Sequence, residues 1–249
     1  MPPSELLLLV LAGVGAGLAG SVAGLASLVS YPALLATGLG AVEANVTNTV
    51  ALVFSSLGSV VGSRPELRGQ GRDIRRLAIS ATAGGIVGAA LLLGTDPETF
   101  ERIAPALIAG ASVAILLRPR PGGDRSRPPR TSRPAVVAGV FGVGVYAGYF
   151  GAAAGVVLLA LFLRAGHDTL ARSNALKNVV LGIANGTAAI GFALLGPVEW
   201  AAIPPLAVGL LAGARLGPVI VRRSDARVLR TLIGLAGLGL AVKLGVDAY

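Results

Sequence analysis

The sequence predicts an all-α polytopic membrane protein with two inverted repeats of about four apolar helical segments each, the first segment of each repeat being broken or re-entrant. Three observations predict this class. The 249-residue chain is 54% hydrophobic and only 13% charged, whereas a soluble domain carries about 25% charged residues. Its 36 glycines are typical of helices that pack closely in a bilayer. Most of its apolar stretches are about as long as one membrane crossing.

Eight apolar segments follow one another along the chain, and six have about the length of one tilted crossing or slightly less. The first and the fifth are longer and are interrupted by small residues. The segments are 6–38, 46–63, 77–94, 102–117, 134–163, 174–195, 201–221 and 229–246. We therefore expect a first transmembrane repeat over 1–117, an Arg/Pro-rich linker over 118–133 and a second repeat over 134–249.

The charges of the connecting loops predict the orientation of these segments. Basic loops belong in the cytoplasm, and this explains the net charge of +9 without a nucleic-acid partner. Two loops, 95–101 and 196–200, are acidic and belong outside. The basic loops, expected in the cytoplasm of a bacterial inner membrane, are 64–76, 118–133 with its six arginines, 164–173 and 222–230.

Segment 134–163 must then enter and leave the membrane on the same side. A hairpin of two half-length helices does this, and so does a re-entrant element, because irregular backbone is tolerated at membrane depth where protein buries it or water reaches it. The N-terminus has no basic stretch before Leu6 and no cleavage site of the usual kind. We therefore expect no removable signal peptide.

The two halves of the sequence resemble each other. Residues 17–24 (GLAGSVAG) correspond to residues 144–151 (GVYAGYFG), and Asn45 aligns with Asn174 after one inserted residue. Further on, Gly84 and Gly88 correspond to Gly209 and Gly213, and Asn48 and Thr49 correspond to Lys177 and Asn178. Equivalent loops carry opposite charges, which favours inverted repeats over two repeats of the same orientation. Inverted repeats place a binding site near the midplane, between broken helices.

Three motifs together resemble the sulfite exporter TauE/SafE family of membrane transporters, over about residues 10 to 245. The first is a glycine-rich break followed by a proline and a leucine pair (AGSVAGLASLVSYPALLATG, 19–38). The second is an amide-bearing helix start in both halves (ANVTNTV and SNALKNVV). The third is an acidic residue before a helix of small residues (Asp73 and Glu199). The sequence departs from the family pattern in two places: the first break lacks a run of three glycines, and the second lacks a proline equivalent to Pro32.

The resemblance implies a transporter that moves sulfite, an organosulfonate or a related small sulfur-containing anion across the bacterial inner membrane, usually outward. Alternating access around a site at the repeat interface is the mechanism we expect. A transporter of another small solute, and a non-transporting membrane assembly protein, stay open as alternatives. The sequence does not predict an oligomeric state, and the surrounding partners are membrane lipids.

Polar residues in the paired helices are the candidate substrate-binding residues. Lys177 has three open interpretations: its ammonium reaches the cytoplasmic interface, bonds neighbouring carbonyls, or helps to hold an anion. Its repeat counterpart is also polar, which favours a site. Neutral donors with a single cation suit transport, because the anion must also leave. The candidates on these helices are Asn45, Asn48, Thr49, Asn174, Lys177 and Asn178.

The glycine breaks are a second source of hydrogen-bond donors. A helix that restarts in mid-membrane presents free N–H groups and a partial positive charge to an oxyanion. Tight helix packing is the alternative role of these glycines. The candidate stretches are 21–27 and 149–156, and the candidate glycines are Gly20, Gly24, Gly148 and Gly151.

Weaker candidates for lining the path are Ser55, Ser56, Asn185, Thr187 and Arg215, although hydroxyls often bond backbone carbonyls and the arginine can also extend to the interface. The chain has no cysteine and one histidine, His167 at a loop edge, and its acidic residues all fall in or next to loops. An embedded enzyme needs a nucleophile with a base, a metal cluster or paired acids. We therefore expect no enzyme, metal site, cofactor or proton relay of side chains.

Overall fold

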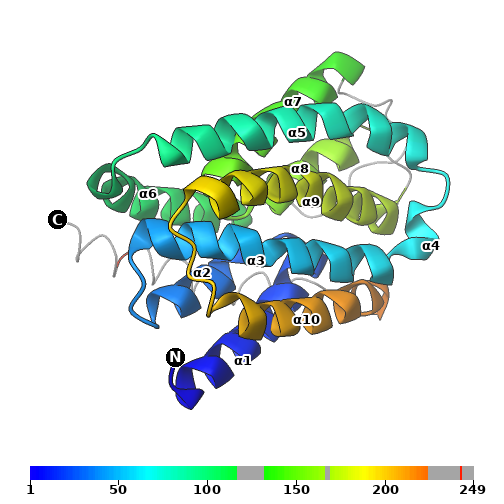
Figure 1. Cartoon of the computed structure of the whole chain (residues 1–249). Helices are drawn as coiled ribbons and strands as arrows, with labels where there is room; N and C mark the ends of the chain where they lie inside the picture. Colours follow the sequence, from blue (N-terminus) through cyan, green and yellow to red (C-terminus); the bar gives the residue numbers. More distant parts are fainter. Residues whose placement is uncertain (117–131, 166–168, 224–241, 243–249) are drawn as a thin grey trace.

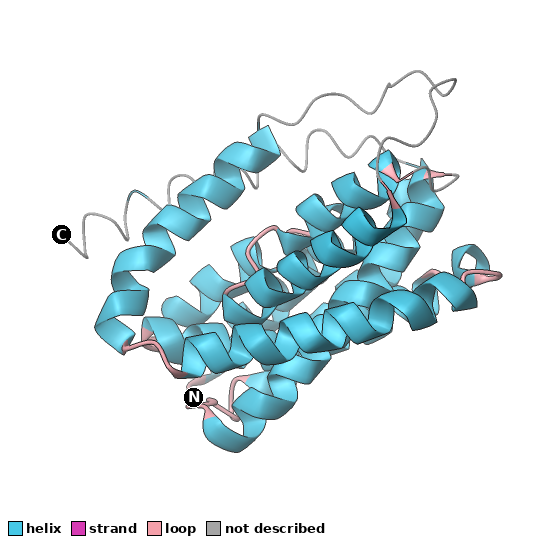
Figure 2. Ribbon diagram, turned by 90° about the horizontal axis from the view of Figure 1, so that it is seen from above, coloured by secondary structure: helices cyan, strands magenta, loops and turns pink. Residues whose placement is uncertain are grey.

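The computed structural model describes residues 1–116, 132–165, 169–223 and 242, and these form ten helices and no strand. The short irregular stretches between the helices lie mostly at the ends of the bundle, and some lie in its middle (Figure 2). The helices are α1 (Pro3–Ala23), α2 (Ser27–Leu35), α3 (Ala41–Gly62), α4 (Arg64–Leu67), α5 (Gly71–Leu93), α6 (Pro97–Leu116), α7 (Arg133–Tyr149), α8 (Ala154–Arg164), α9 (Leu170–Leu195) and α10 (Ile203–Arg223).

Four of these helices are long and apolar enough to cross a membrane, namely α1, α3, α5 and α9. Two shorter apolar helices are α8 and the stretch Ile203–Val219 of α10. The all-helical class expected from the sequence is therefore confirmed. The last apolar segment, 229–246, lies outside the described residues apart from residue 242.

The interruptions expected in the two long segments are confirmed. Segment 6–38 is divided into α1 and α2, and segment 134–163 is divided into α7 and α8. Each shorter helix packs back against the longer helix before it. Several loop boundaries were wrong: the stretch expected as the basic loop 64–76 is mostly helical, and α6 begins inside the acidic loop 95–101. In addition, α9 begins inside the expected loop 164–173, and α10 ends inside the expected loop 222–230. Charged residues continue these helices because water at the membrane surface solvates them at little cost.

Helices of the first half of the chain pack against helices of the second half (Figure 1). The most extensive packing joins α1 to α10 and α5 to α7, and α9 also packs against both α3 and α5. Glycines allow the close contacts: a methyl group on Gly213 of α10 would overlap the Val14 carbonyl oxygen of α1, and one on Gly88 of α5 would overlap the Val145 carbonyl oxygen of α7. This is small-residue packing of the kind that joins helices in lipid.

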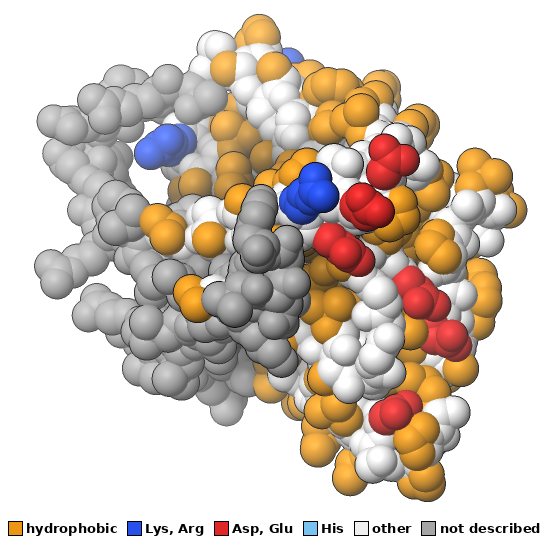
Figure 3. All heavy atoms as spheres, turned by 90° about the vertical axis from the view of Figure 1, so that its left-hand side faces the viewer, with side chains coloured by type: hydrophobic (Ala, Val, Ile, Leu, Met, Phe, Trp, Pro, Cys, Tyr) orange, Lys and Arg blue, Asp and Glu red, His pale blue; other side chains and the backbone are white. Residues whose placement is uncertain are grey.

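The bundle has an acidic end and a basic end. Helices α1, α3 and α6 begin at the acidic end, each with a glutamate in its first turn, and the connection of α9 to α10 carries Glu199. Figure 3 faces this end: most of its described surface is hydrophobic or uncharged, and acidic side chains outnumber basic ones among the charged residues that it shows. The opposite end carries α4, the start of α5 and the end of α8, which bring Arg64, Arg68, Arg72, Arg75, Arg76 and Arg164.

At each end of the bundle, one hydrogen bond joins a connection between helices to a neighbouring helix. At the acidic end the Glu199 backbone N–H donates to the hydroxyl of Thr47 (2.9 Å). At the basic end the Gln70 amide donates to the Arg172 carbonyl (3.2 Å). Figure 1 shows the start of α3 and the connection of α9 to α10 at one end of the bundle, and α4 and the start of α5 at the other.

Candidate functional site

The two broken helices end in the same backbone conformation. Gly24 follows α1 with φ of 76°, and Gly151, its sequence counterpart, lies just after α7 with φ of 73°. L side chains rarely adopt this left-handed region, so glycine ends helices there at little cost. At the first break the Gly24 N–H donates to the Gly20 carbonyl (2.8 Å) and the Leu25 N–H to the Ala19 carbonyl (3.2 Å).

The first break touches the start of α8, in the other half of the chain. A methyl group on Gly24 would lie 2.5 Å from the carbonyl carbon of Gly155, and one on Gly155 would lie 2.6 Å from the Cα of Gly24. Backbone therefore meets backbone between the halves, which only glycine at both positions allows. The break of one half and the restarting helix of the other are thus held together in the middle of the bundle.

Polar side chains from each half bond the broken helix of the other half. The amide of Asn174 donates to the carbonyl of Ser21 at the end of α1 (2.8 Å). The amide of Asn45, its sequence counterpart, donates to the carbonyl of Tyr149 at the end of α7 (2.8 Å). Helix ends leave carbonyls without partners inside the helix, and these two amides bond one at each break.

Lys177 contacts the same end of α1. Its Nζ donates to the carbonyl of Gly20 (3.0 Å), and its side chain is fully buried. The structure therefore places the ammonium at a backbone carbonyl inside the bundle. A cation at a helix C-terminus also interacts favourably with the partial negative charge there. This geometry explains how the apolar bundle tolerates a lysine.

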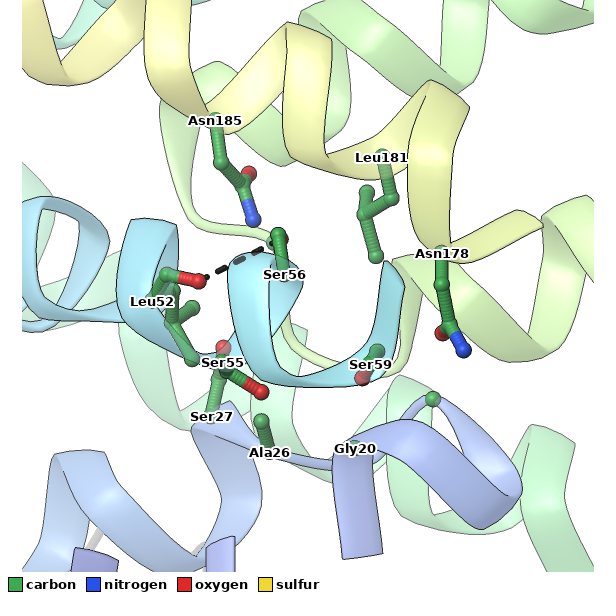
Figure 4. Close-up of a pocket in the computed structure, with 12 residues that line it drawn as sticks. Gly20, Ala26, Ser27, Leu52, Ser55, Ser56, Ser59, Asn178, Leu181 and Asn185 are labelled. Atoms are coloured by element: carbon green, nitrogen blue, oxygen red, sulfur yellow. Dashed lines mark hydrogen bonds between the residues drawn. The ribbon is translucent and has the colours of Figure 1, made fainter. Parts of the chain in front are cut away.

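A pocket with serine and asparagine side chains in its lining opens beside the breaks (Figure 4). Figure 4 shows α9 contributing Asn178, Leu181 and Asn185 on one side, with Ser56 of α3 pointing toward Asn185. Ser55 and Ser59 of α3 lie on the side of α3 that faces the first break. Residues of the first break and of the start of α2 line another side of the pocket. The lining residues are Gly20, Gly24, Ala26, Ser27, Leu52, Ser55, Ser56, Ser59, Gly151, Asn178, Leu181 and Asn185.

The pocket lies on the basic-end side of the breaks. Ser55, Ser56 and Ser59 belong to the second half of α3, which ends beside α4 at the basic end. Asn178 is two turns into α9, which begins at that same end. Asn178 is 6% exposed, and its amide nitrogen has no hydrogen-bond partner among the described residues. It is a buried donor with capacity for a ligand oxygen.

The residues expected at the site fall into three groups. The pocket lining includes Gly20, Gly24, Gly151, Asn178, Ser55, Ser56 and Asn185. Asn45, Asn174 and Lys177 bond the helix ends behind the pocket. The third group consists of the expected residues that neither line the pocket nor bond a helix end at the breaks.

Each residue outside the first two groups has another contact or environment. Thr49 bonds the Asn45 carbonyl and Asn48 accepts from Ser30. Thr187 bonds the Ile183 carbonyl of its own helix, and Arg215 is exposed on α10. Gly148 packs α7 against α5, where an added methyl would lie 2.7 Å from the Gly85 carbonyl oxygen.

Sequence reasoning did not single out Ser27 and Ser59 as individual pocket residues, although Ser27 closes one of the candidate stretches. Ser59 lies one turn beyond Ser55 on α3, so helical spacing was the signal that connects them. Buried hydroxyls are hard to assign from sequence because most of them bond the carbonyl one turn back, as Ser56 does with Leu52 (3.3 Å).

The pocket lining, as far as the structure describes it, offers hydroxyl and amide groups to a ligand and contains no carboxylate. No carboxylate is buried among the described residues, and they contain no group of His, Asp or Glu that holds a metal. Hydroxyl and amide groups of this kind can donate hydrogen bonds to a polar solute. The lining has no general base or nucleophile of the kind that an enzyme site needs.

Apolar helices of membrane-spanning length around two broken helices and a pocket with serine and asparagine side chains define a multi-pass membrane transporter. The model of the family described as "Sulfite exporter TauE/SafE" matches residues 9–244. The chain therefore belongs to the sulfite exporter TauE/SafE family.

Three relatives agree with this class. The chain is 30% identical over 245 residues to "Probable membrane transporter protein YfcA" of Escherichia coli (strain K12), covering 94% of this chain and 87% of the relative. It is 26% identical to "Probable membrane transporter protein" of Haemophilus influenzae, covering 97% and 95%. It is 24% identical to "Probable membrane transporter protein ORF9" of Sinorhizobium sp, covering 93% and 89%. No solved structure matches the chain significantly.

Proposed function

We propose that the protein exports a small sulfur-containing oxyanion, sulfite or an organosulfonate, by alternating access around the pocket beside the two breaks. The observation that carries this proposal is the pocket itself. Its lining combines serine hydroxyls and the unbonded Asn178 amide with backbone from both breaks. These groups donate to sulfonate oxygens and hold the anion weakly enough for release, as transport requires.

The packing of helices of one half against helices of the other supports inverted repeats over 1–117 and 134–249, joined by the linker 118–133. Sequence counterparts make reciprocal contacts: α1 packs on α10 and α7 packs on α5, while Asn174 bonds the end of α1 and Asn45 bonds the end of α7. Contacts of this kind are expected when two equivalent units are related by a pseudo-two-fold axis in the membrane plane.

The charged ends of the bundle support a cytoplasmic basic end in a bacterial inner membrane. The pocket then lies on the cytoplasmic side of the breaks, from which an exported anion enters. An inside-negative potential favours the exit of an anion by about 2.3 kcal/mol per charge per 100 mV. Export therefore needs no buried carboxylate to carry protons. A carrier for another small solute is the alternative, and the lack of a buried carboxylate among the described residues speaks against a cation.

The direct test is solute flux in proteoliposomes that contain the purified wild-type protein. We expect uptake or counterflow of sulfite and of a small sulfonate such as sulfoacetate, and none of sodium or divalent metal ions. Empty liposomes are the control for leakage. Flux of a cation without flux of either sulfur anion would replace this proposal with the alternative carrier.

A further inference from the structure

Four aromatic rings gather on the acidic-end side of the breaks. The chain has only six phenylalanines, four tyrosines and one tryptophan. Tyr31 of α2 meets Phe150 edge-on, with ring centroids 5.5 Å apart. Phe100 of α6 meets Phe150 at 5.8 Å and Tyr149 at 5.9 Å. Rings at these distances form a cohesive contact between three separate elements.

This aromatic cluster faces the opposite direction from the pocket. Phe100 is in the first turns of α6, between acidic residues of the acidic end, whereas the pocket serines approach the basic end. Phe150 lies inside the second break, directly before Gly151, which lines the pocket. Tyr31, Phe100 and Phe150 are each at most 2% exposed. The rings therefore separate the pocket from the acidic end.

Tyr31 differs from the two phenylalanines because it has a polar atom. Its hydroxyl is buried and has no hydrogen-bond partner among the described residues. A buried tyrosine hydroxyl usually finds a hydrogen-bond partner, because leaving it unbonded is unfavourable. A hydroxyl left in this state in a closed conformation is available to an anion when the rings separate.

We propose that Tyr31, Phe100 and Phe150 form the outer gate of the transport path, and that the Tyr31 hydroxyl donates to the anion as it leaves. This inference rests on the proposed function, since it assumes transport through the pocket from the basic to the acidic end. The structure is then the form in which the path is open to the basic side and closed by the aromatic cluster. Opening requires that α2 and α6 move away from the second break.

The absence of cysteine from the sequence allows a direct accessibility test. The variant Ser56→Cys places one thiol in the pocket, and a membrane-impermeant maleimide is added to either side of oriented vesicles. We expect labelling from the basic side only. Adding Phe100→Ala removes one ring of the gate, and labelling from the acidic side then rises by about tenfold or more, the change that about 1.4 kcal/mol of lost closure produces.

The control for lost packing is Phe162→Ala, because Phe162 is fully buried in a separate hydrophobic cluster on α8. It should leave acidic-side labelling unchanged. Phe150→Leu is the milder gate variant if Phe100→Ala does not fold. Folded gate variants that label from the acidic side no faster than Ser56→Cys alone would overturn the gate.

Tyr31→Phe tests the hydroxyl separately because it keeps the ring. We expect the labelling pattern of the closed gate and sulfonate flux lowered by about tenfold, as for one charge-assisted hydrogen bond. Unchanged flux would overturn the role of the hydroxyl. Labelling needs no substrate, so the gate is decided even if the wild type carries no sulfur anion. In that case the proposed function fails, and the role of the hydroxyl fails with it.

Discussion

Lys177→Met should lower sulfonate flux by at least about tenfold, although the ammonium does not line the pocket. The Lys177 Nζ bonds the carbonyl of Gly20, and Gly20 itself is a pocket residue. A hydrogen bond to a charged group contributes about 1.5–3 kcal/mol. Without it the end of α1 is held less firmly, and the pocket wall at the first break shifts. Flux in proteoliposomes measures the effect.

Two further variants separate the contributions of Lys177. Lys177→Gln keeps a donor without the charge and should retain more flux than Lys177→Met. Asn174→Leu removes the neighbouring bond to the Ser21 carbonyl. Because both side chains hold the same helix end, the double variant Asn174→Leu with Lys177→Met should lose less than the sum of the two single losses.

The surface control for charge is Arg75→Gln at the exposed basic end. It removes one positive charge without removing a buried bond, and its flux should match that of the wild type. Full flux in Lys177→Met, in folded protein, would show that neither the bond nor the charge at the first break matters for transport.

Gly24→Ala should abolish transport and destabilise the protein strongly. Two costs combine at this position. The left-handed backbone, with φ of 76°, costs a non-glycine residue about 1–2 kcal/mol. The added methyl would also lie 2.5 Å from the Gly155 carbonyl carbon, and backbone cannot move aside as a flexible side chain does. Overpacking of this kind adds about 1–3 kcal/mol.

Gly38→Ala is the matched control for Gly24→Ala. Gly38 has φ of 87°, and a methyl added there meets nothing within 4 Å. It therefore carries the conformational cost alone. Thermal unfolding in detergent should show a small loss for Gly38→Ala and a much larger one for Gly24→Ala. Equal losses for the two variants would mean that the contact between Gly24 and Gly155 contributes nothing to stability.

The fold was largely predictable from the sequence because apolar length and glycine position depend on local chemistry. The breaks after α1 and α7 were expected at the glycine-rich stretches, and both occur there. The helix starts were less predictable. Helix α5 begins before Asp73 and α6 before Glu98, because charged residues at a membrane surface are compatible with helix and give no hydropathy signal.

The sequence predicted several residues that lie at the two breaks, but not how they are bonded there, and substrate binding by them stays a prediction. The repeated amides correctly indicated the meeting place of the two halves. From sequence, however, a buried lysine beside a break has the same appearance whether it bonds a carbonyl or a ligand. Only the three-dimensional distance to the Gly20 carbonyl shows which helix end Lys177 contacts. Likewise, Gly148 resembles Gly20 in sequence, and only packing against α5 distinguishes them.

The concentration dependence of sulfonate flux for Asn178→Leu tests whether the pocket beside the breaks is the substrate site. Asn178 contributes the unbonded buried amide of the pocket. Loss of a charge-assisted bond of about 1.5–3 kcal/mol weakens apparent affinity by about tenfold or more. Thr187→Val on the same helix is the control, because its hydroxyl bonds only the Ile183 carbonyl among the described residues. We expect weakened affinity for Asn178→Leu and wild-type affinity for Thr187→Val. Wild-type affinity in both variants would contradict a substrate site at this pocket.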